Sequence, residues 1–215
     1  METGRFVVKE VFSIRKIGIL GGTFDPVHLG HLTAAEAVRE AYDLEQVLFI
    51  PAGEPPHKLD QTKTAAWHRY WMTVLATLDN PKFDVSPVEI QREGVSYTID
   101  TLMYFREKMG SESEIYFIAG ADLVFEIAGW RRSDALFERC VFVIVTRPGF
   151  DFGRLRDNLS GVLTQAQLNR IAPLEIPALE VSSTEIRQKI KAGRTVRYLI
   201  PEAVDAYIRK NGLYR

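Results

Sequence analysis

The sequence is poor in cysteine: its 215 residues include only Cys140. One cysteine excludes an internal disulfide and fits a reducing compartment, so we expect a cytoplasmic protein. Cys140 directly precedes the apolar run 141–145. That position favours a small buried side chain over a catalytic nucleophile, because a reactive thiol needs an electropositive, partly exposed setting.

The sequence also lacks long apolar runs and a surplus of charge of either sign. No apolar run approaches the ~20 residues of a membrane span, and the first residues mix charged with apolar side chains, unlike a secretory signal. The 27 basic and 28 acidic residues leave a net charge of −1, whereas a dedicated nucleic-acid binder has a basic surplus. We expect neither a membrane nor a nucleic-acid partner. A homo-oligomer is compatible with this composition.

Strand-like apolar segments alternate with helical patterns over the first two thirds of the chain. The strand-like runs lie at 16–20, 46–50, 115–119 and 141–145, and the helical patterns at 31–42, 65–79 and 98–109. Strands that are apolar on both faces and alternate with helices indicate a parallel sheet covered on both sides. In such α/β folds ligands bind at the carboxyl ends of the strands.

The pattern weakens after Arg147. The residues there fit a short helix near 164–170 and a strand near 173–176, followed by helices at 184–192 and 201–210. Pro201 suits a first helical turn, where its missing N–H group is not needed. We predict a single domain over 16–215, with the C-terminal helices packed onto it, and an N-terminal extension over 1–15.

The most informative segment is 18–32, which reads GILGGTFDPVHLGHL. A strand runs into the glycine turn 21–23, and His28 and His31 stand where a helix begins. Glycines let backbone N–H groups approach an anion, a helix N-terminus attracts it, and the two imidazoles add donors. The segment therefore predicts a phosphate site.

The ordinary alternative for the two histidines is a packed pair or a metal site on one helix face. Only His57 and His68 remain as further histidine ligands, and there is no pair of cysteines. We therefore favour phosphate contact for His28 and His31 and predict no protein metal site.

Two further segments offer cations or hydroxyl groups near a strand end or a helix start. In PPHK at 55–58, Lys58 is either a phosphate ligand or one of two solvated loop charges. The segment SSTEIR contains a capping box of Ser182 with Glu185. The same hydroxyls and free N–H groups can hold phosphate, with Arg187 about one turn further in.

Single residues after other strands extend the candidate site. Asp122 ends the segment GAD and can accept hydrogen bonds from ribose hydroxyls or cap the next helix. Trp130 beside Arg131 is either a packing residue or a stacking plate for a heteroaromatic ring. Thr98 opens a helical pattern whose first N–H groups can receive a carboxylate. Arg147 is either a phosphate ligand or a surface arginine.

Together these motifs resemble the bacterial nicotinate-nucleotide adenylyltransferases over almost the whole chain. The motifs are GGTFDPVHLGHL at 21–32, PPHK at 55–58, Arg69-x-x-Met72, SYTIDTL at 96–102, FIAGAD with Trp130 at 117–130, RPG at 147–149, SSTEIR at 182–187 and a closing segment ending in NGLYR. The first is a signature of the wider nucleotidyltransferase superfamily with the HxGH motif. Three further features narrow the resemblance from the superfamily to this family. They are SYT, the spacing from GAD to the tryptophan, and the closing segment that ends in NGLYR. Val181 stands where isoleucine is commoner.

The resemblance implies a Rossmann-like nucleotidyltransferase fold with about five parallel strands. It implies transfer of the adenylyl group of ATP to nicotinate mononucleotide, giving deamido-NAD and pyrophosphate in NAD biosynthesis. The implied catalytic residues are His28, His31, Lys58 and Arg187. The implied ATP-binding residues are Gly21, Gly22, Thr23, Phe24, Gly120, Asp122, Ser182 and Ser183. The implied mononucleotide-binding residues are Lys58, Thr98, Trp130, Arg131 and Arg147.

The chemistry of this transfer explains why no carboxylate or cysteine catalyst is needed. The attacking phosphate monoester has a second pKa of about 6 and is already mostly dianionic at neutral pH. Catalysis then consists of positioning and charge neutralisation. We expect Mg²⁺ to be carried mainly by the ATP phosphates and water.

Two alternatives stay open at this point. Another superfamily member, such as a pantetheine-phosphate adenylyltransferase or a cytidylyltransferase, shares the histidine and serine motifs but lacks the SYT and tryptophan context. A non-catalytic nucleotide-binding module is expected to have lost His28, His31 or Arg187, and all three are present.

Overall fold

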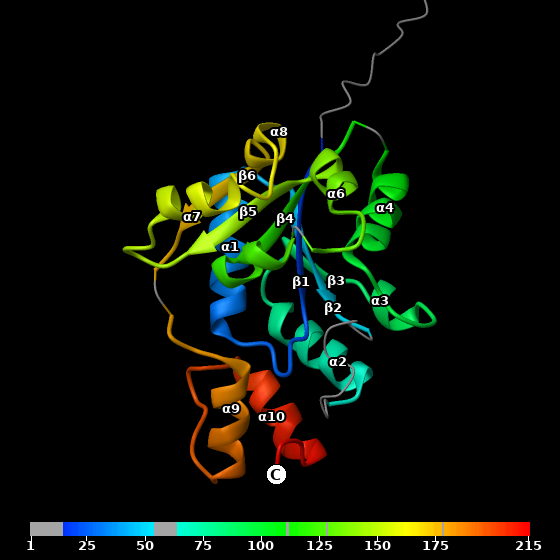
Figure 1. Cartoon of the computed structure of the whole chain (residues 1–215). Helices are drawn as coiled ribbons and strands as arrows, with labels where there is room; N and C mark the ends of the chain where they lie inside the picture. Colours follow the sequence, from blue (N-terminus) through cyan, green and yellow to red (C-terminus); the bar gives the residue numbers. More distant parts are fainter. Residues whose placement is uncertain (1–14, 54–63, 111, 128, 178) are drawn as a thin grey trace, which may run out of the picture.

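The computed structural model describes residues 15–53, 64–110, 112–127, 129–177 and 179–215 (Figure 1). Over these residues six parallel strands form one sheet, in the order β3-β2-β1-β4-β5-β6. The strands are β1 (Lys16–Gly22), β2 (Gln46–Pro51), β3 (Phe83–Val85), β4 (Glu114–Gly120), β5 (Val141–Thr146) and β6 (Ile171–Glu175). This confirms the parallel α/β fold, and the five predicted strands correspond to all of these except β3.

The sequence analysis missed β3 because this strand carries little of the apolar signal. It has only three residues, FDV, and its central Asp84 is exposed. The strand lies at the sheet edge beside β2. A short, charged edge strand protects a sheet from pairing with another chain, but it leaves no apolar run to recognise.

The described helices cover both faces of the sheet, as predicted. One face is covered by α1 (Leu29–Ala41) and α2 (Ala66–Thr77). The helices α9 (Ser183–Lys191) and α10 (Glu202–Asn211) add to the same core from beyond the end of the sheet, where α10 packs on α2 (Figure 1). The other face is covered by α4 (Thr98–Met109), α5 (Val124–Ile127), α6 (Ser133–Arg139), α7 (Phe152–Leu159) and α8 (Gln165–Leu168). Short turns form α3 (Val88–Gln91) and the 3-10 helix η2 (Ala121–Leu123). No helix within the described ranges is long and apolar enough to cross a membrane.

Cys140 lies in the core between α6 and β5. Its side chain is buried, and burial raises the pKa of its thiol to about 12. The thiol is therefore protonated at neutral pH. This confirms the prediction of a small packing residue rather than a nucleophile.

The strand order reverses between β1 and β4, and this reversal determines where a ligand can bind. The chain leaves β1 toward β2 and β3 on one side, and β4, β5 and β6 follow on the other. Ligands of open α/β sheets bind beyond the carboxyl ends of the strands at such a point. Figure 1 shows α9 and α10 lying at that end of β1, next to the start of α1.

A close backbone contact after β2 yields a first prediction. A Cβ atom added at Gly53 would lie 2.2 Å from the carbonyl oxygen of Glu89 in α3, so the backbone would have to shift. We expect Gly53→Ala to lower the free energy of unfolding by about 2 kcal/mol, measured by urea unfolding. Gly161→Ala is the control, because a Cβ atom there meets nothing within 4 Å. Equal unfolding midpoints for the two variants would contradict the prediction.

Candidate nucleotide-binding site

A cavity of about 710 Å³ lies beyond the carboxyl ends of β1, β4 and β5. It brings together predicted residues from four separate segments of the chain, which are Gly21, Gly22, His28, His31, Gly120, Arg147, Ser182 and Ser183. Because β1 and β4 flank the reversal of strand order, the cavity occupies the position expected for a ligand site.

The two predicted histidines form one stacked pair at the start of α1. Their ring centroids are 3.7 Å apart, and the ring planes are inclined by 23°. The backbone N–H of His28 donates to Nδ1 of His31 at 3.2 Å. Because this nitrogen accepts a hydrogen bond, a neutral His31 carries its proton on Nε2.

Close packing surrounds the ring of His28. Its Nδ1 atom is buried and has no hydrogen-bond partner among the described residues. A Cβ atom at Gly30 would lie 3.1 Å both from this nitrogen and from Cγ1 of Val181. The glycine between the two histidines therefore leaves the space in which the ring and the segment before α9 meet.

Burial keeps both imidazoles uncharged at neutral pH. It lowers the pKa of His28 from 6.5 to about 4. It lowers the pKa of His31 well below 6.5, and the neighbouring His28 lowers it further. The pair thus consists of neutral donors and acceptors, and a bound anion would favour their protonation.

The glycine turn before the histidines rests on a buried phenylalanine. Phe24 adopts a left-handed backbone, with φ 50°, and is only 2% exposed. Its ring meets His31 edge to face at 5.0 Å, and a Cβ atom at Gly22 would lie 2.8 Å from the ring. The ring of Phe24, predicted to bind ATP, is therefore not in the cavity wall; it supports His31 from the core.

Arg69 organises the turn, a role that the sequence analysis did not assign to it. Its guanidinium is 2% exposed and donates to the carbonyl oxygens of Thr23 at 2.7 Å and Ala52 at 2.6 Å. Further hydrogen bonds reach the carbonyls of Gly53 and Thr64. One buried cation therefore joins the carboxyl ends of β1 and β2. The sequence marked this residue as part of the Arg69-x-x-Met72 motif but gave no role for it.

The start of α9 uses its serines for structure as well as for the cavity wall. Ser182 Oγ accepts the backbone N–H of Glu185 at 3.1 Å, as the predicted cap requires. The other half of the predicted capping box is not formed, since the Glu185 carboxylate pairs with Lys189 at 3.4 Å. Ser183 Oγ donates to the carbonyl oxygen of Pro26 at 2.8 Å.

Arg187, predicted as a phosphate ligand, holds the same turn. Its Nη1 donates to the carbonyl oxygen of Asp25 at 2.8 Å, and its Nη2 donates to Thr184 Oγ1 at 3.2 Å. The residue does not line the cavity. Arg187 therefore holds the turn at Asp25. Thr23, predicted to bind ATP, is the residue at which Arg69 holds it.

The residues predicted for the nicotinate end form a second group, at the start of α4. The guanidinium of Arg131 lies 4.6 Å from the ring centroid of Tyr97, which directly precedes Thr98. Trp130 is partly buried and meets the ring of Phe117 edge to face at 6.0 Å. Among the described residues no side chain caps α4. The N–H of Asp100 bonds to the carbonyl oxygen of Tyr97, which leaves the N–H groups of Thr98 and Ile99 as candidate donors to a ligand.

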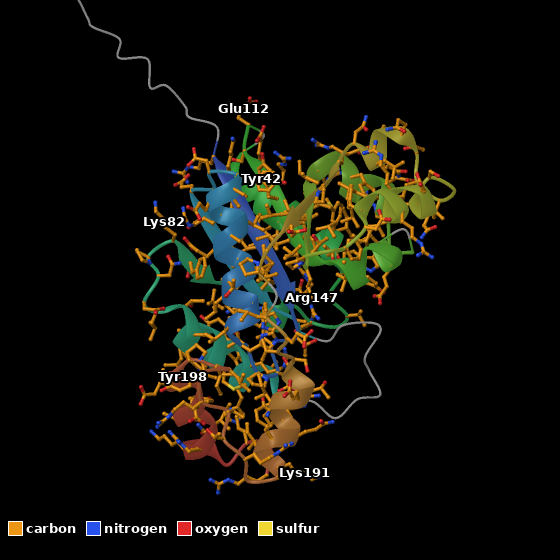
Figure 2. All side chains as sticks on the ribbon, turned by 90° about the vertical axis from the view of Figure 1, so that its left-hand side faces the viewer. Tyr42, Lys82, Glu112, Arg147, Lys191 and Tyr198 are labelled. Atoms are coloured by element: carbon orange, nitrogen blue, oxygen red, sulfur yellow. The ribbon has the colours of Figure 1, made fainter. Side chains whose placement is uncertain are left out.

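Arg147, predicted to bind the mononucleotide, belongs to the first group: it is exposed and lines the cavity with the histidines and serines, not the site of Thr98 and Trp130. Figure 2 shows it between the sheet and the C-terminal helices. Lys58 and the side chain of Asp122 lie outside the described residues. Within the described part of the chain, no group of three His, Cys, Asp or Glu side chains could hold a metal ion.

The fold and the HxGH turn define a nucleotidyltransferase, and comparison with known proteins agrees. The family model described as cytidylyltransferase-like matches residues 19–189. A solved structure with the same fold is the Plasmodium falciparum nicotinic acid mononucleotide adenylyltransferase complexed with NaAD. It has a TM-score of 0.72 at 21% identity and covers 93% of this chain and 97% of that one.

Curated relatives narrow the class further. The probable nicotinate-nucleotide adenylyltransferase of Moorella thermoacetica is 50% identical over 200 residues, covering 93% of this chain and 92% of the relative. That of Thermoanaerobacter sp. is 48% identical, with coverages of 93% and 94%. The chain belongs to the nicotinate-nucleotide adenylyltransferase family.

The lowered histidine pKa values predict a pH-dependent stability. An unfolded histidine binds a proton with a pKa of about 6.5, whereas folded His28 does so with a pKa of about 4. Between these two pH values the unfolded state therefore holds more protons than the folded state. Stability is therefore full above this window and falls as the pH drops through it. His28 alone lowers the free energy of unfolding by about 2 kcal/mol at pH 5.

Urea unfolding at pH 8 and pH 5 measures this effect. His28→Asn is expected to lose the contribution of His28, about 2 kcal/mol between pH 8 and pH 5, and to keep that of His31. The control is His68→Asn, which removes a ring bonded to Tyr207 instead. An unchanged pH dependence in His28→Asn would show that His28 is not a source of it.

Proposed function

We propose that this protein transfers the adenylyl group of ATP to nicotinate mononucleotide, giving deamido-NAD and pyrophosphate. The observation that carries the proposal is the meeting of the glycine turn, the histidine pair and the start of α9 in one cavity at the reversal of strand order. The open start of α4, with Trp130 and Arg131 nearby, supports a carboxylated aromatic acceptor. The names of the relatives support the same reaction.

The reaction needs alignment of two anions more than it needs a base. A phosphate oxygen of the mononucleotide attacks the α-phosphorus of ATP and forms a new P–O bond. The bond from the α-phosphorus to the bridging oxygen breaks, and pyrophosphate leaves with that electron pair. Because the attacking phosphate is mostly dianionic at neutral pH, no proton has to be removed from it first. The protein lowers the repulsion between the two substrates and holds them in line.

The histidine pair suits this task because its charge follows the substrate. With Nδ1 of His31 accepting a backbone N–H, its Nε2–H is the group free to donate to a phosphate. The arriving negative charge raises the pKa of both rings toward protonation. Positive charge is thus strongest where and when the reacting phosphates are present. Backbone N–H groups at Gly22 and at the start of α9 supply further donors.

We treat Mg²⁺ as part of the nucleotide substrate. ATP enters as its magnesium complex, in which phosphate oxygens and water hold the ion. The hydroxyl and imidazole groups of the cavity then contact the phosphates, and Arg147 adds an exposed cation at the rim. Lys58 is assigned to the mononucleotide phosphate by the family resemblance.

At the nicotinate end, we assign the carboxylate to the first N–H groups of α4 and the ring to Trp130. A helix of 12 residues without a side-chain cap offers these donors together with the positive end of its dipole. Arg131 adds a cation next to the same helix start.

Replacing either histidine tests the transfer step. We expect His31→Ala to lower kcat about 100-fold, the effect of losing one transition-state donor, in an assay of pyrophosphate release. His68→Ala, a change between α2 and α10, is the control and keeps kcat within about two-fold of wild type. Full activity in His31→Ala would contradict the assigned role.

Comparison of the acid with the amide mononucleotide tests the acceptor. With ATP as the other substrate, we expect kcat/KM to be about 100-fold or more higher for the acid mononucleotide than for the amide. The reason is that the N–H donors at the start of α4 lose their charged partner when the amide binds. Equal kcat/KM values would overturn the assignment of the α4 start. Turnover of pantetheine phosphate but not of either mononucleotide would overturn the proposed function.

A further inference from the structure

In the closing segment NGLYR, the side chain of Tyr214 reaches the turn between β1 and α1, where it contacts Asp25. Helix α10 ends at Gly212 in a left-handed conformation, with φ 63°, and the N–H of Leu213 bonds back to the carbonyl oxygen of Ile208. Tyr214 also has a left-handed backbone, with φ 64°. The chain therefore folds back after α10 and directs this side chain inward.

The hydroxyl of Tyr214 bonds to the residue that anchors the turn. It donates to Oδ1 of Asp25 at 2.6 Å and lies 3.9 Å from the sulfur of Met72. The Asp25 carboxylate is 6% exposed, and its other oxygen, Oδ2, accepts the backbone N–H of Thr64 at 3.4 Å. Asp25 stands three residues before His28, and Arg187 holds its carbonyl oxygen.

We propose that Tyr214 is a positioning residue for adenylyl transfer: through Asp25 it fixes the turn from which His28 and His31 meet the phosphates. This proposal rests on the proposed function. It also gives a reason for the Arg69-x-x-Met72 motif, because Arg69 bonds to the turn at Thr23 and Met72 contacts the hydroxyl of Tyr214.

The chemistry of the pair suits a permanent bond. Burial and the hydrogen bond to Asp25 raise the pKa of the Tyr214 phenol, so it stays a donor throughout the working pH range. A buried carboxylate without this donor would have to find another partner or shift. Because the turn is short, a shift of Asp25 is passed on to the histidine pair.

The chain offers a matched control for the test. Tyr207, in α10, also donates to or accepts from a residue of α2, since its hydroxyl lies 2.8 Å from Nδ1 of His68. Tyr207→Phe and Tyr214→Phe therefore each remove one hydroxyl from the C-terminal segment. Only Tyr214→Phe removes a bond to the turn. The imidazole signals of His28 and His31 report on Tyr214, and that of His68 reports on Tyr207.

The experiment measures steady-state kinetics and the imidazole nitrogen signals of both variants by NMR. We expect Tyr214→Phe to lower kcat about 10-fold, with KM for both substrates within about two-fold, and to shift the signals of His28 and His31. Tyr207→Phe is expected to leave kcat within about two-fold of wild type and to shift only the signal of His68.

Three results would overturn the proposal. These are an unchanged kcat in Tyr214→Phe, a lowered kcat with unmoved signals of His28 and His31, and failure of Tyr214→Phe to fold, which would make the hydroxyl a stability element only. Absence of turnover in the wild-type protein would instead count against the proposed function, and the NMR comparison would still decide the role of Tyr214.

Discussion

The short turn between β1 and α1 can exist only because distant side chains bind its carbonyl groups. The carbonyl oxygens of Thr23, Asp25 and Pro26 receive hydrogen bonds from Arg69, Arg187 and Ser183, respectively. These donors are 46, 162 and 157 residues away from their partners in the sequence. A buried carbonyl left without a donor costs about 1–3 kcal/mol. The turn therefore forms only when α2 and α9 are in place, and the histidines that follow it depend on the same packing.

This dependence explains how the positive charge of the site is organised. Two guanidinium groups, those of Arg69 and Arg187, are used to hold backbone rather than to face the cavity. The histidines are neutral until an anion arrives. A cavity with several bare buried cations would be costly to fold. In the proposed mechanism, the attraction for phosphate comes from backbone N–H groups, helix starts and imidazoles that gain charge on binding, which avoids that cost.

Most of the helices and strands and the position of the site could be predicted from the sequence, but the hydrogen bonds between distant segments could not. Long apolar runs and helical periodicity located the five main strands and the longer helices to within about two residues. The three-residue β3 and the short α3 and α5 carry too few residues for such a pattern. Helices α6 and α7, of seven and eight residues, were not predicted either. Chain order also indicated that the glycine turn, the histidines and the serines would meet, because each follows a strand or starts a helix.

The roles of single side chains were harder to predict, because they depend on contacts between distant segments. In this structure Arg187 holds the Asp25 carbonyl and Phe24 is buried under His31, contacts that no motif indicated. The predicted contacts of both residues with ATP stay predictions. Arg69 and Tyr214 stood in recognised motifs without an assigned function. A motif identifies residues typical of a family. The role of each residue becomes visible only when its hydrogen-bond partners in the folded chain are known.

We propose that the cavity between β1 and β4 joins two anionic nucleotides at the histidine pair. A crystal structure of this protein with bound deamido-NAD would show whether it does. We expect the diphosphate bridge within hydrogen-bond distance of His28 or His31 and of the α9 start, with the nicotinate carboxylate at the first N–H groups of α4. A dinucleotide bound away from the glycine turn, or with its nicotinate ring far from Trp130, would contradict it.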